Sequence, residues 1–384
     1  MTEPYSSRVR TPKEMVMQIT DQSISAEQRG TSMSEQKSVK EWANPVGLDG
    51  MEFVEFAAPD PAILENLFRT FGFKKIGKHK KKEVFLYRQG RTNFILNNEP
   101  NTFAAEFAKA HGPSICATGF RVKDAKKALE VAVANGAKPI DIKNDQSSHS
   151  FPAMFGIGDS AIYFVDRYQE KSHYDDDFDY FEGDRNPDGF GLDYVDHLTN
   201  NVPAGDMQQW CDFYAKIFNF KEVRQFDIKG KNTGLTSKVM RSPCQKITIP
   251  INEPTEAKSQ IQEYLDAYHG SGIQHLAFLT NDICQSVSSL REQGINFLGA
   301  PDSYFDMIQD RVPNVTENIE QLKKLQVLVD GDEDGYLLQI FTKNLIGPIF
   351  FEIIQRKNND GFGNGNFQAL FDAIEKDQRE RGYL

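Results

Sequence analysis

The sequence contains little cysteine, no long apolar run and no excess of positive charge. Its 384 residues include four cysteines that form no CxxC pair, which argues against a zinc ribbon or a thioredoxin-type redox site. No apolar stretch approaches transmembrane length, and the N-terminal residues lack the apolar core of a signal peptide. The formal net charge of -11 disfavours non-specific binding to nucleic acid. We therefore expect a protein of the reducing cytoplasm with no nucleic-acid or membrane partner.

The composition, 39% hydrophobic and 26% charged, supports a folded core in a chain long enough for two or three domains. Residues 1–42 are polar and show no periodic pattern, which predicts a disordered tail. After this tail the chain repeats itself. FVEFAAPDPAILENLFRTFGFK near Phe53 resembles YVDHLTNNVPAGDMQQWCDFYAKIFNFK near Tyr194, and FILNNEP matches ITIPINEP.

A second pair of segments extends the repeat. The segment that starts at His111 matches the one that starts at His269, and in both a strand pattern is followed by a helix that ends at glycine. The sequence therefore predicts two copies of one α+β unit. We place the first copy at residues 43–170, an acidic linker at 171–190, and the second copy at 191–384.

The two copies differ in residue type at matched strand positions. The second copy carries His197 and His275, which align with the apolar Phe56 and Ala117 of the first copy. A third polar group, Glu352, lies in FFEII, a run typical of a buried strand. A buried carboxylate is costly unless it is paired, protonated or bound to a metal. The asymmetry predicts a site that only the C-terminal copy contains.

Two histidines and one carboxylate on separate strands are the donor set of a non-haem Fe(II) site, which leaves three metal positions open. The alternative is that the histidines are satisfied core residues, and their spacing alone does not decide between the two. The asymmetric repeat and the buried glutamate favour the metal site. The other histidines are weaker candidates. We interpret His79 as part of a basic turn, His149 and His173 as loop residues, and His111 and His269 as structural because both copies contain them.

Eight segments together carry a family resemblance: DGMEFVEF, VDHLTNNV, RSPCQKITIPINEP, SQIQEYL, GSGIQHLAF, LLQIFTKN, FFEIIQR and GFGNGNFQALFDAIE. Through them the chain resembles 4-hydroxyphenylpyruvate dioxygenases from Asn44 to Gly382. The resemblance implies a vicinal oxygen chelate fold, with two tandem domains of paired βαβββ modules. It also implies an Fe(II) cofactor whose ligands are His197, His275 and Glu352.

The resemblance further implies a substrate pocket closed by a C-terminal lid helix at about residues 366–382. It assigns substrate contacts to Ser237, Asn252, Gln260, Gln274, Gln339, Phe341, Phe362 and Phe367, and positions near the lid or in the aromatic lining to Asn366, Phe350 and Phe351. Without it, Gln260 could equally begin an exposed helix and Phe341 could be a core residue. The glycines of GFGNGNF suit a hinge. A phosphate loop is disfavoured because no Lys-Ser/Thr follows them.

The implied reaction converts 4-hydroxyphenylpyruvate and O2 to homogentisate and CO2, a step of tyrosine and phenylalanine catabolism in which both oxygen atoms are incorporated. One alternative is 4-hydroxymandelate synthase, which shares the fold, metal and substrate; Asn252 and Phe341 favour the dioxygenase. A zinc- or nickel-dependent lyase or isomerase of the same superfold is another, and a non-enzymatic binding module is a third. Family members commonly form homodimers or homotetramers, so we expect one of these states.

Overall fold

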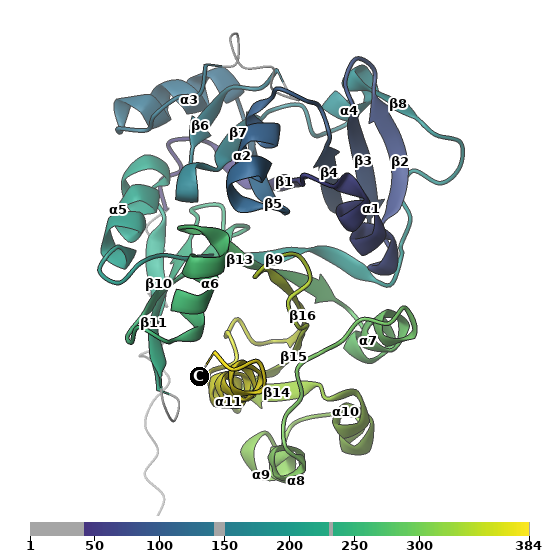
Figure 1. Cartoon of the computed structure of the whole chain (residues 1–384), viewed down its shortest axis with the longest axis vertical. Helices are drawn as coiled ribbons and strands as arrows, with labels where there is room; N and C mark the ends of the chain where they lie inside the picture. Colours follow the sequence, from purple (N-terminus) through teal and green to yellow (C-terminus); the bar gives the residue numbers. More distant parts are fainter. Residues whose placement is uncertain (1–41, 142–149, 230–232, 384) are drawn as a thin grey trace, which may run out of the picture. The chain divides into compact units, whose positions relative to one another are not determined.

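The computed structural model describes residues 42–141, 150–229 and 233–383, and the tail predicted at 1–42 lies outside them except for Trp42. Each half of the described chain builds one eight-stranded sheet (Figure 1). The strands of the first sheet are β1 (Leu48–Ala57), β2 (Lys74–His79), β3 (Val84–Gln89), β4 (Thr92–Asn97), β5 (Ser114–Val122), β6 (Ala153–Phe155), β7 (Ala161–Val165) and β8 (Phe178–Tyr180). The helices of this half are α1 (Pro61–Thr70), α2 (Phe103–His111), α3 (Ala125–Ala134), the 3-10 helix η1 (Ile157–Asp159) and α4 (His173–Asp177).

The second half contains the other sheet and, among the described residues, more helices than the first half. Its strands are β9 (Leu192–Asn201), β10 (Lys221–Lys229), β11 (Gly234–Arg241), β12 (Thr248–Pro254), β13 (Gly272–Thr280), β14 (Leu328–Gly331), β15 (Tyr336–Phe341) and β16 (Phe350–Lys357). Its helices are α5 (Met207–Phe218), α6 (Gln260–Tyr268), α7 (Ile283–Glu292), α8 (Asp302–Asp306), α9 (Ile308–Arg311), α10 (Ile319–Leu325) and α11 (Asn364–Glu380). Among the described residues, no helix is both long and apolar enough to cross a bilayer.

The two sheets share one topology around a central antiparallel pair. The strand order is β6-β7-β5-β1-β4-β3-β2-β8 in the first sheet and β10-β11-β12-β9-β13-β16-β15-β14 in the second. In each, the antiparallel pair (β1–β5 or β9–β13) is flanked by parallel pairs, β1–β4 and β5–β7 or β9–β12 and β13–β16. Parallel neighbours need crossover connections, and helices supply them. The predicted fold of two tandem units with paired βαβββ modules is confirmed.

The halves differ at their edges. The last module of the second half has three strands after its helices, β14, β15 and β16. In the described part of the first half, the matching module has only β6 and β7 after α3. The first sheet is instead extended at its other edge, where β8 pairs with β2. The segment 171–190, predicted as an acidic linker, thus contains α4 and β8. Its acidic residues surround the buried rings of Tyr174 and Phe178, which anchor these elements to the first sheet.

A β-bulge occurs at matched points of the two central pairs. In the second sheet Ala277 lies opposite His197 and Phe278 opposite Val195, so Asp196 is the additional residue. In the first sheet Met51 lies opposite Phe120 and Phe53 opposite Gly119, so Glu52 is the additional residue. A bulge re-aims the local side chains, and here it allows Asp196 to reach its own neighbour, His197.

This register corrects one sequence alignment. The counterpart of His197 in the first sheet is Phe53, and not Phe56 as the strand motifs suggested; the counterpart of His275 is Ala117, as predicted. The similar strings FVEF and YVDH lie three positions out of register with the paired strands. The residue matched to His197 is apolar in either alignment, so the asymmetry between the copies stands.

One hydrophobic core extends through both halves. Phe71 and Phe94 of the first half contact Phe351 and Phe278 of the second, with ring centroids 5.0 Å apart for Phe71 and Phe351 and 5.9 Å for Phe94 and Phe278. Successive strand residues point to opposite faces. The side chain of Phe351 therefore faces this core, while its neighbours Phe350 and Glu352 face the other side of the sheet, where the pocket lies.

The described histidines outside the candidate site lie at the ends of helices and strands or in the core. His269 ends α6 in a left-handed conformation, and His111 Nδ1 lies 2.7 Å from the carbonyl oxygen of Tyr268. His79 is the last residue of strand β2 and not part of a turn. His173 is fully buried at the start of α4, so its interpretation as a polar-loop residue is wrong. His149 lies outside the described residues.

Candidate metal centre

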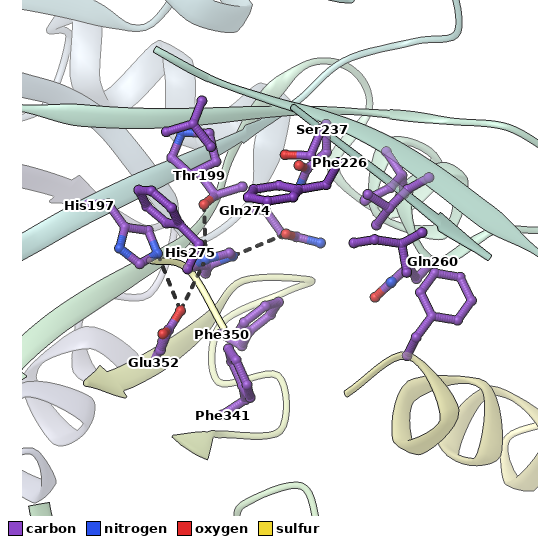
Figure 2. Close-up of a pocket in the computed structure, with 18 of the residues that line it drawn as sticks. His197, Thr199, Phe226, Ser237, Gln260, Gln274, His275, Phe341, Phe350 and Glu352 are labelled. Carbon is purple, nitrogen blue, oxygen red and sulfur yellow. Dashed lines mark hydrogen bonds and ion pairs between the residues drawn. The ribbon is translucent and has the colours of Figure 1, made fainter. Parts of the chain in front are cut away.

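Three buried side chains converge at the centre of the second sheet. His197 on β9, His275 on β13 and Glu352 on β16 meet because β13 lies between the other two strands, with Ala277 opposite both His197 and Glu352. His197 Nε2 lies 3.3 Å, and His275 Nε2 3.6 Å, from the same Glu352 Oε2 atom (Figure 2). Donor atoms of all three residues lie within 4.8 Å of one another.

The two imidazoles are both buried, but neighbouring carboxylates shift the pKa of one of them in the opposite direction. Burial alone would lower the pKa of His197, but the carboxylates of Glu352 and Asp196 outweigh it and raise this pKa to about 9. Burial lowers the pKa of His275 well below its ordinary value, and the nearby His197 lowers it further. His275 is therefore held neutral, the form that can ligate a metal.

The donor set fits a divalent metal ion. Two imidazole nitrogens and one carboxylate oxygen on three adjacent strands can occupy one face of the ion, and imidazole together with carboxylate suits Fe(II). A cation would also balance the charge of the buried Glu352 carboxylate. The buried Glu352 carboxylate thus has both histidines as partners.

Neighbouring polar groups orient each of the three donors. Asp196 Oδ2 lies 2.8 Å from His197 Nδ1, on the ring edge opposite Glu352. Gln274 Oε1 lies 3.1 Å from His275 Nδ1. Gln339 Nε2 donates to Glu352 Oε1 at 3.0 Å. Hydrogen bonds of this kind fix the ring orientation and the tautomer of a metal-binding histidine.

The three donors form part of the wall of a pocket between the second sheet and α11. Eight of the residues that the resemblance assigned line it: Ser237, Asn252, Gln260, Gln274, Gln339, Phe341, Phe350 and Phe362. Figure 2 shows Ser237 and Gln260 on the side of the pocket away from Glu352. Amides in an otherwise apolar pocket can orient a polar ligand without adding charge.

Two assigned residues with described side chains are not in this lining. Phe351 packs in the shared core. Asn366 is buried behind the pocket wall, where its Nδ2 donates to Gln339 Oε1 at 2.9 Å and its Oδ1 accepts from Tyr304. The side chain of Phe367 lies outside the part of the chain that the structure describes.

Sequence reasoning missed a further set of lining residues. They are Thr199, Phe226, Ile228, Leu235, Val239, Pro250, Ile261 and Phe371. Several alternate along single strands, as in Phe226 and Ile228 on β10 or Leu235, Ser237 and Val239 on β11. Because side chains two apart share a face, the assigned Ser237 could have pointed to its neighbours at i-2 and i+2.

The comparisons with known proteins agree with this architecture. Residues 42–179 match the family model described as "Hydroxyphenylpyruvate dioxygenase, HPPD, N-terminal". Residues 194–340 match the model of the Glyoxalase/Bleomycin resistance protein/Dioxygenase superfamily. The first model spans the strands of the first sheet, and the second spans most of the second sheet but ends before β16.

Individual relatives cover most of the chain. It is 50% identical over 347 residues to a 4-hydroxyphenylpyruvate dioxygenase of Pseudomonas aeruginosa, covering 89% of this chain and 97% of the relative. It is also 50% identical over 349 residues to Hemolysin VllY of Vibrio vulnificus, with 89% and 98% covered. A solved triple mutant of 4-hydroxymandelate synthase from Streptomyces coelicolor is 27% identical, with a TM-score of 0.73, and covers 86% of this chain and 99% of its own. The chain belongs to the 4-hydroxyphenylpyruvate dioxygenase family.

Proposed function

We propose that this chain converts 4-hydroxyphenylpyruvate and O2 to homogentisate and CO2 in tyrosine and phenylalanine catabolism, with Fe(II) as its cofactor. The observation that carries the proposal is the convergence of His197, His275 and Glu352 in an amide- and phenylalanine-lined pocket. The 50% identity to a dioxygenase of this name supports the same activity.

The side chains of the pocket have distinct tasks in this reaction. Bound Fe(II) would supply open coordination positions for the 2-oxo acid and for O2, held on one face by His197, His275 and Glu352. Ser237, on the side away from Glu352, offers hydrogen bonds to the phenol end of the substrate. Phe341 contacts the aromatic ring and keeps water from the reacting carbon atoms.

Helix α11 serves as the lid in this proposal. Phe362, just before it, and Phe371 within it both line the pocket. The cavity of about 70 Å³ is small for a substrate with an aromatic ring and an oxo-acid side chain, so we expect its walls to shift on binding. The helix is held partly by polar contacts that can exchange with water: Glu375 accepts from Thr233, and Gln378 donates to Glu263 at 2.8 Å. These features support opening for substrate and closure before turnover.

Product identification tests the reaction. The protein is reconstituted anaerobically with Fe(II) and 4-hydroxyphenylpyruvate, O2 is admitted, and the products are separated. We expect homogentisate and CO2 with one O2 consumed per turnover. 4-Hydroxymandelate as the main product would instead assign the chain to the synthase, the second candidate, whose solved structure is similar over 86% of this chain.

The cytoplasm is the proposed compartment, because all four cysteines are free thiols, as a reducing environment requires. A homodimer or homotetramer is the proposed assembly, and sedimentation of the purified protein tests it.

A further inference from the structure

A chain of hydrogen bonds leads from His197 to the segment that precedes α11. Asp196 Oδ2 lies 2.8 Å from His197 Nδ1. The same carboxylate accepts two parallel bonds from Arg356, from Nε at 2.8 Å and from Nη2 at 2.7 Å. Both partners are mostly buried, with 9% of the Asp196 side chain and 17% of the Arg356 side chain exposed. A bidentate pair of this kind has strict geometry.

The remaining nitrogen of Arg356 binds the backbone near the lid. Nη1 donates to the carbonyl oxygens of Asn359 at 3.1 Å and Gly361 at 2.6 Å. The guanidinium also lies 5.6 Å from the ring centre of Phe362, and that ring is 5.5 Å from the ring of His197. The Arg356 guanidinium therefore contacts Asp196, which orients His197, and also the backbone of residues 359–361, which lead into α11.

A second, shorter connection reaches the same region from the other side. Gln339 donates a hydrogen bond to Glu352 and accepts one from Asn366 Nδ2. Asn366 belongs to the first turn of α11. The backbone at Gly363 lies so close that an added Cβ would be 1.6 Å from Gln339 Oε1. Gly363 has a φ of +78°, which favours glycine. Two of the three metal donors are thus linked to residues 359–366.

We propose that Arg356 is a positioning residue that couples the orientation of His197 to the placement of residues 359–362, so that metal binding and docking of α11 strengthen each other. When the turn moves, Arg356 loses two carbonyl partners and its fork is free to rotate away from Asp196, which loosens His197. Coupling of two equilibria is reciprocal. The inference rests on the proposed function for the roles of the metal and the lid, while its test needs no substrate.

The first sheet supplies a matched control. Glu52 occupies the same bulge position as Asp196, and it accepts a hydrogen bond at 2.5 Å from Arg121. The matched positions around this pair hold Phe53 and Ala117 in place of the histidines. Replacing Arg121 with lysine therefore makes the same chemical change at an acid–arginine pair with no metal donors beside it.

The experiment compares Arg356→Lys with Arg121→Lys and wild type. Lysine keeps the charge but cannot bind a carboxylate and two carbonyls in one plane. Anaerobic Fe(II) titration against a competing chelator should show affinity about tenfold weaker in Arg356→Lys, because residues that orient metal ligands typically contribute 10- to 100-fold. Hydrogen exchange of residues 359–383 should slow when Fe(II) binds wild type and Arg121→Lys, and this protection should be lost in Arg356→Lys.

Two results would overturn the inference: wild-type affinity with wild-type lid protection in Arg356→Lys, or an equal loss of affinity in Arg121→Lys. If Arg356→Lys does not fold, Asp196→Asn, which preserves shape, gives the same two readouts and must lose both metal affinity and lid protection. Failure of the proposed function would look different. In that case wild type would form no homogentisate, whereas the metal and exchange measurements without substrate would still decide the role of Arg356.

Discussion

The two halves of the chain share the strand order around their central antiparallel pair but differ in the side chains at its centre. At the three matched positions where the second sheet places His197, His275 and Glu352, the first sheet places Phe53, Ala117 and Tyr163. Phe53 and Tyr163 contact each other, with ring centroids 6.0 Å apart, whereas their counterparts His197 and Glu352 belong to the group of metal-donor side chains. One copy has an apolar interior and the other a buried polar cluster.

The helices that cover the two sheets show the same contrast between an apolar and a polar interior. In the first half, α4 delivers Tyr174 into a cluster of buried aromatic and aliphatic side chains. In the second half, α11 lies over the sheet and leaves a pocket beneath Phe371. Burial of apolar surface stabilises a fold, while buried polar donors are tolerated where they are satisfied or bind a ligand. We infer from this comparison that the first half contributes chiefly stability and the second half chemistry, and four predictions test that division.

The largest effect should come from removing a metal donor. His197→Ala, His275→Ala and Glu352→Ala should each reduce homogentisate formation below detection and weaken Fe(II) binding, because two donors cannot hold the ion in the same position. Circular dichroism should show a folded chain in each. The matched first-half change Tyr163→Phe should keep turnover. Activity retained after any one of the three ligand changes would remove that residue from the donor set.

The next largest effect should come from a change in the first half, and it should alter only the free energy of unfolding. Phe53→Ala removes a fully buried ring from the position that matches His197. The cavity should lower the free energy of unfolding by about 3–5 kcal/mol, measured by denaturant titration. Fe(II) affinity and turnover of the folded fraction should stay at the wild-type level, with Phe53→Leu as the milder control. A specific loss of metal binding in folded Phe53→Ala would break the proposed division between the halves.

A smaller effect should follow from loosening α11, which has no counterpart among the described residues of the first half. Glu375 is buried and accepts from the amide and hydroxyl of Thr233, both at 3.1 Å. Glu375→Ala should weaken docking of the helix by about 1–3 kcal/mol, and O2 should then be consumed without an equal yield of homogentisate. The exposed neighbour Lys376→Ala is the control. Normal coupling in Glu375→Ala would argue against a lid held by this contact.

The contrast between the halves was partly visible in the sequence. The repeat revealed the two copies, and His197 and His275 stood out because their partners in the other copy are apolar. Glu352 stood out because a carboxylate in FFEII is improbable without a partner. The confirmed tandem fold follows from the same periodicities, which depend on local residue order alone.

The parts that were not predicted depend on register and tertiary contacts. A shift of one residue exchanges the two faces of a strand, so the sequence could not decide between Phe350 and Phe351 or find the bulge that matches His197 with Phe53. His173 looked like a loop residue because its acidic neighbours hide the ring contacts that bury it. The link through Arg356 joins residues 160 positions apart, which no local pattern reveals.

The smallest effect should come from the bulge residue of the first half. Burial raises the pKa of Glu52 above its ordinary value, although Arg121 opposes the shift. Glu52→Gln removes the ionisable group and leaves Arg121 with 30% of its side chain exposed and its guanidinium 5.4 Å from the ring centre of Tyr168. At pH 7 the variant should therefore match wild type in free energy of unfolding to within about 1 kcal/mol, with unchanged Fe(II) affinity.

The free energy of unfolding of wild type and of Glu52→Gln should also depend differently on pH. Because the folded-state pKa of Glu52 is raised, the folded state holds its proton more tightly than the unfolded state does. That stabilisation is fully present below the ordinary glutamate pKa of about 4.5 and is lost as the pH rises through the raised value. Wild type should thus lose stability relative to Glu52→Gln between pH 4 and pH 7, measured by urea titration at both values. A relative gain would mean that pairing with Arg121 outweighs burial and stabilises the ionised carboxylate.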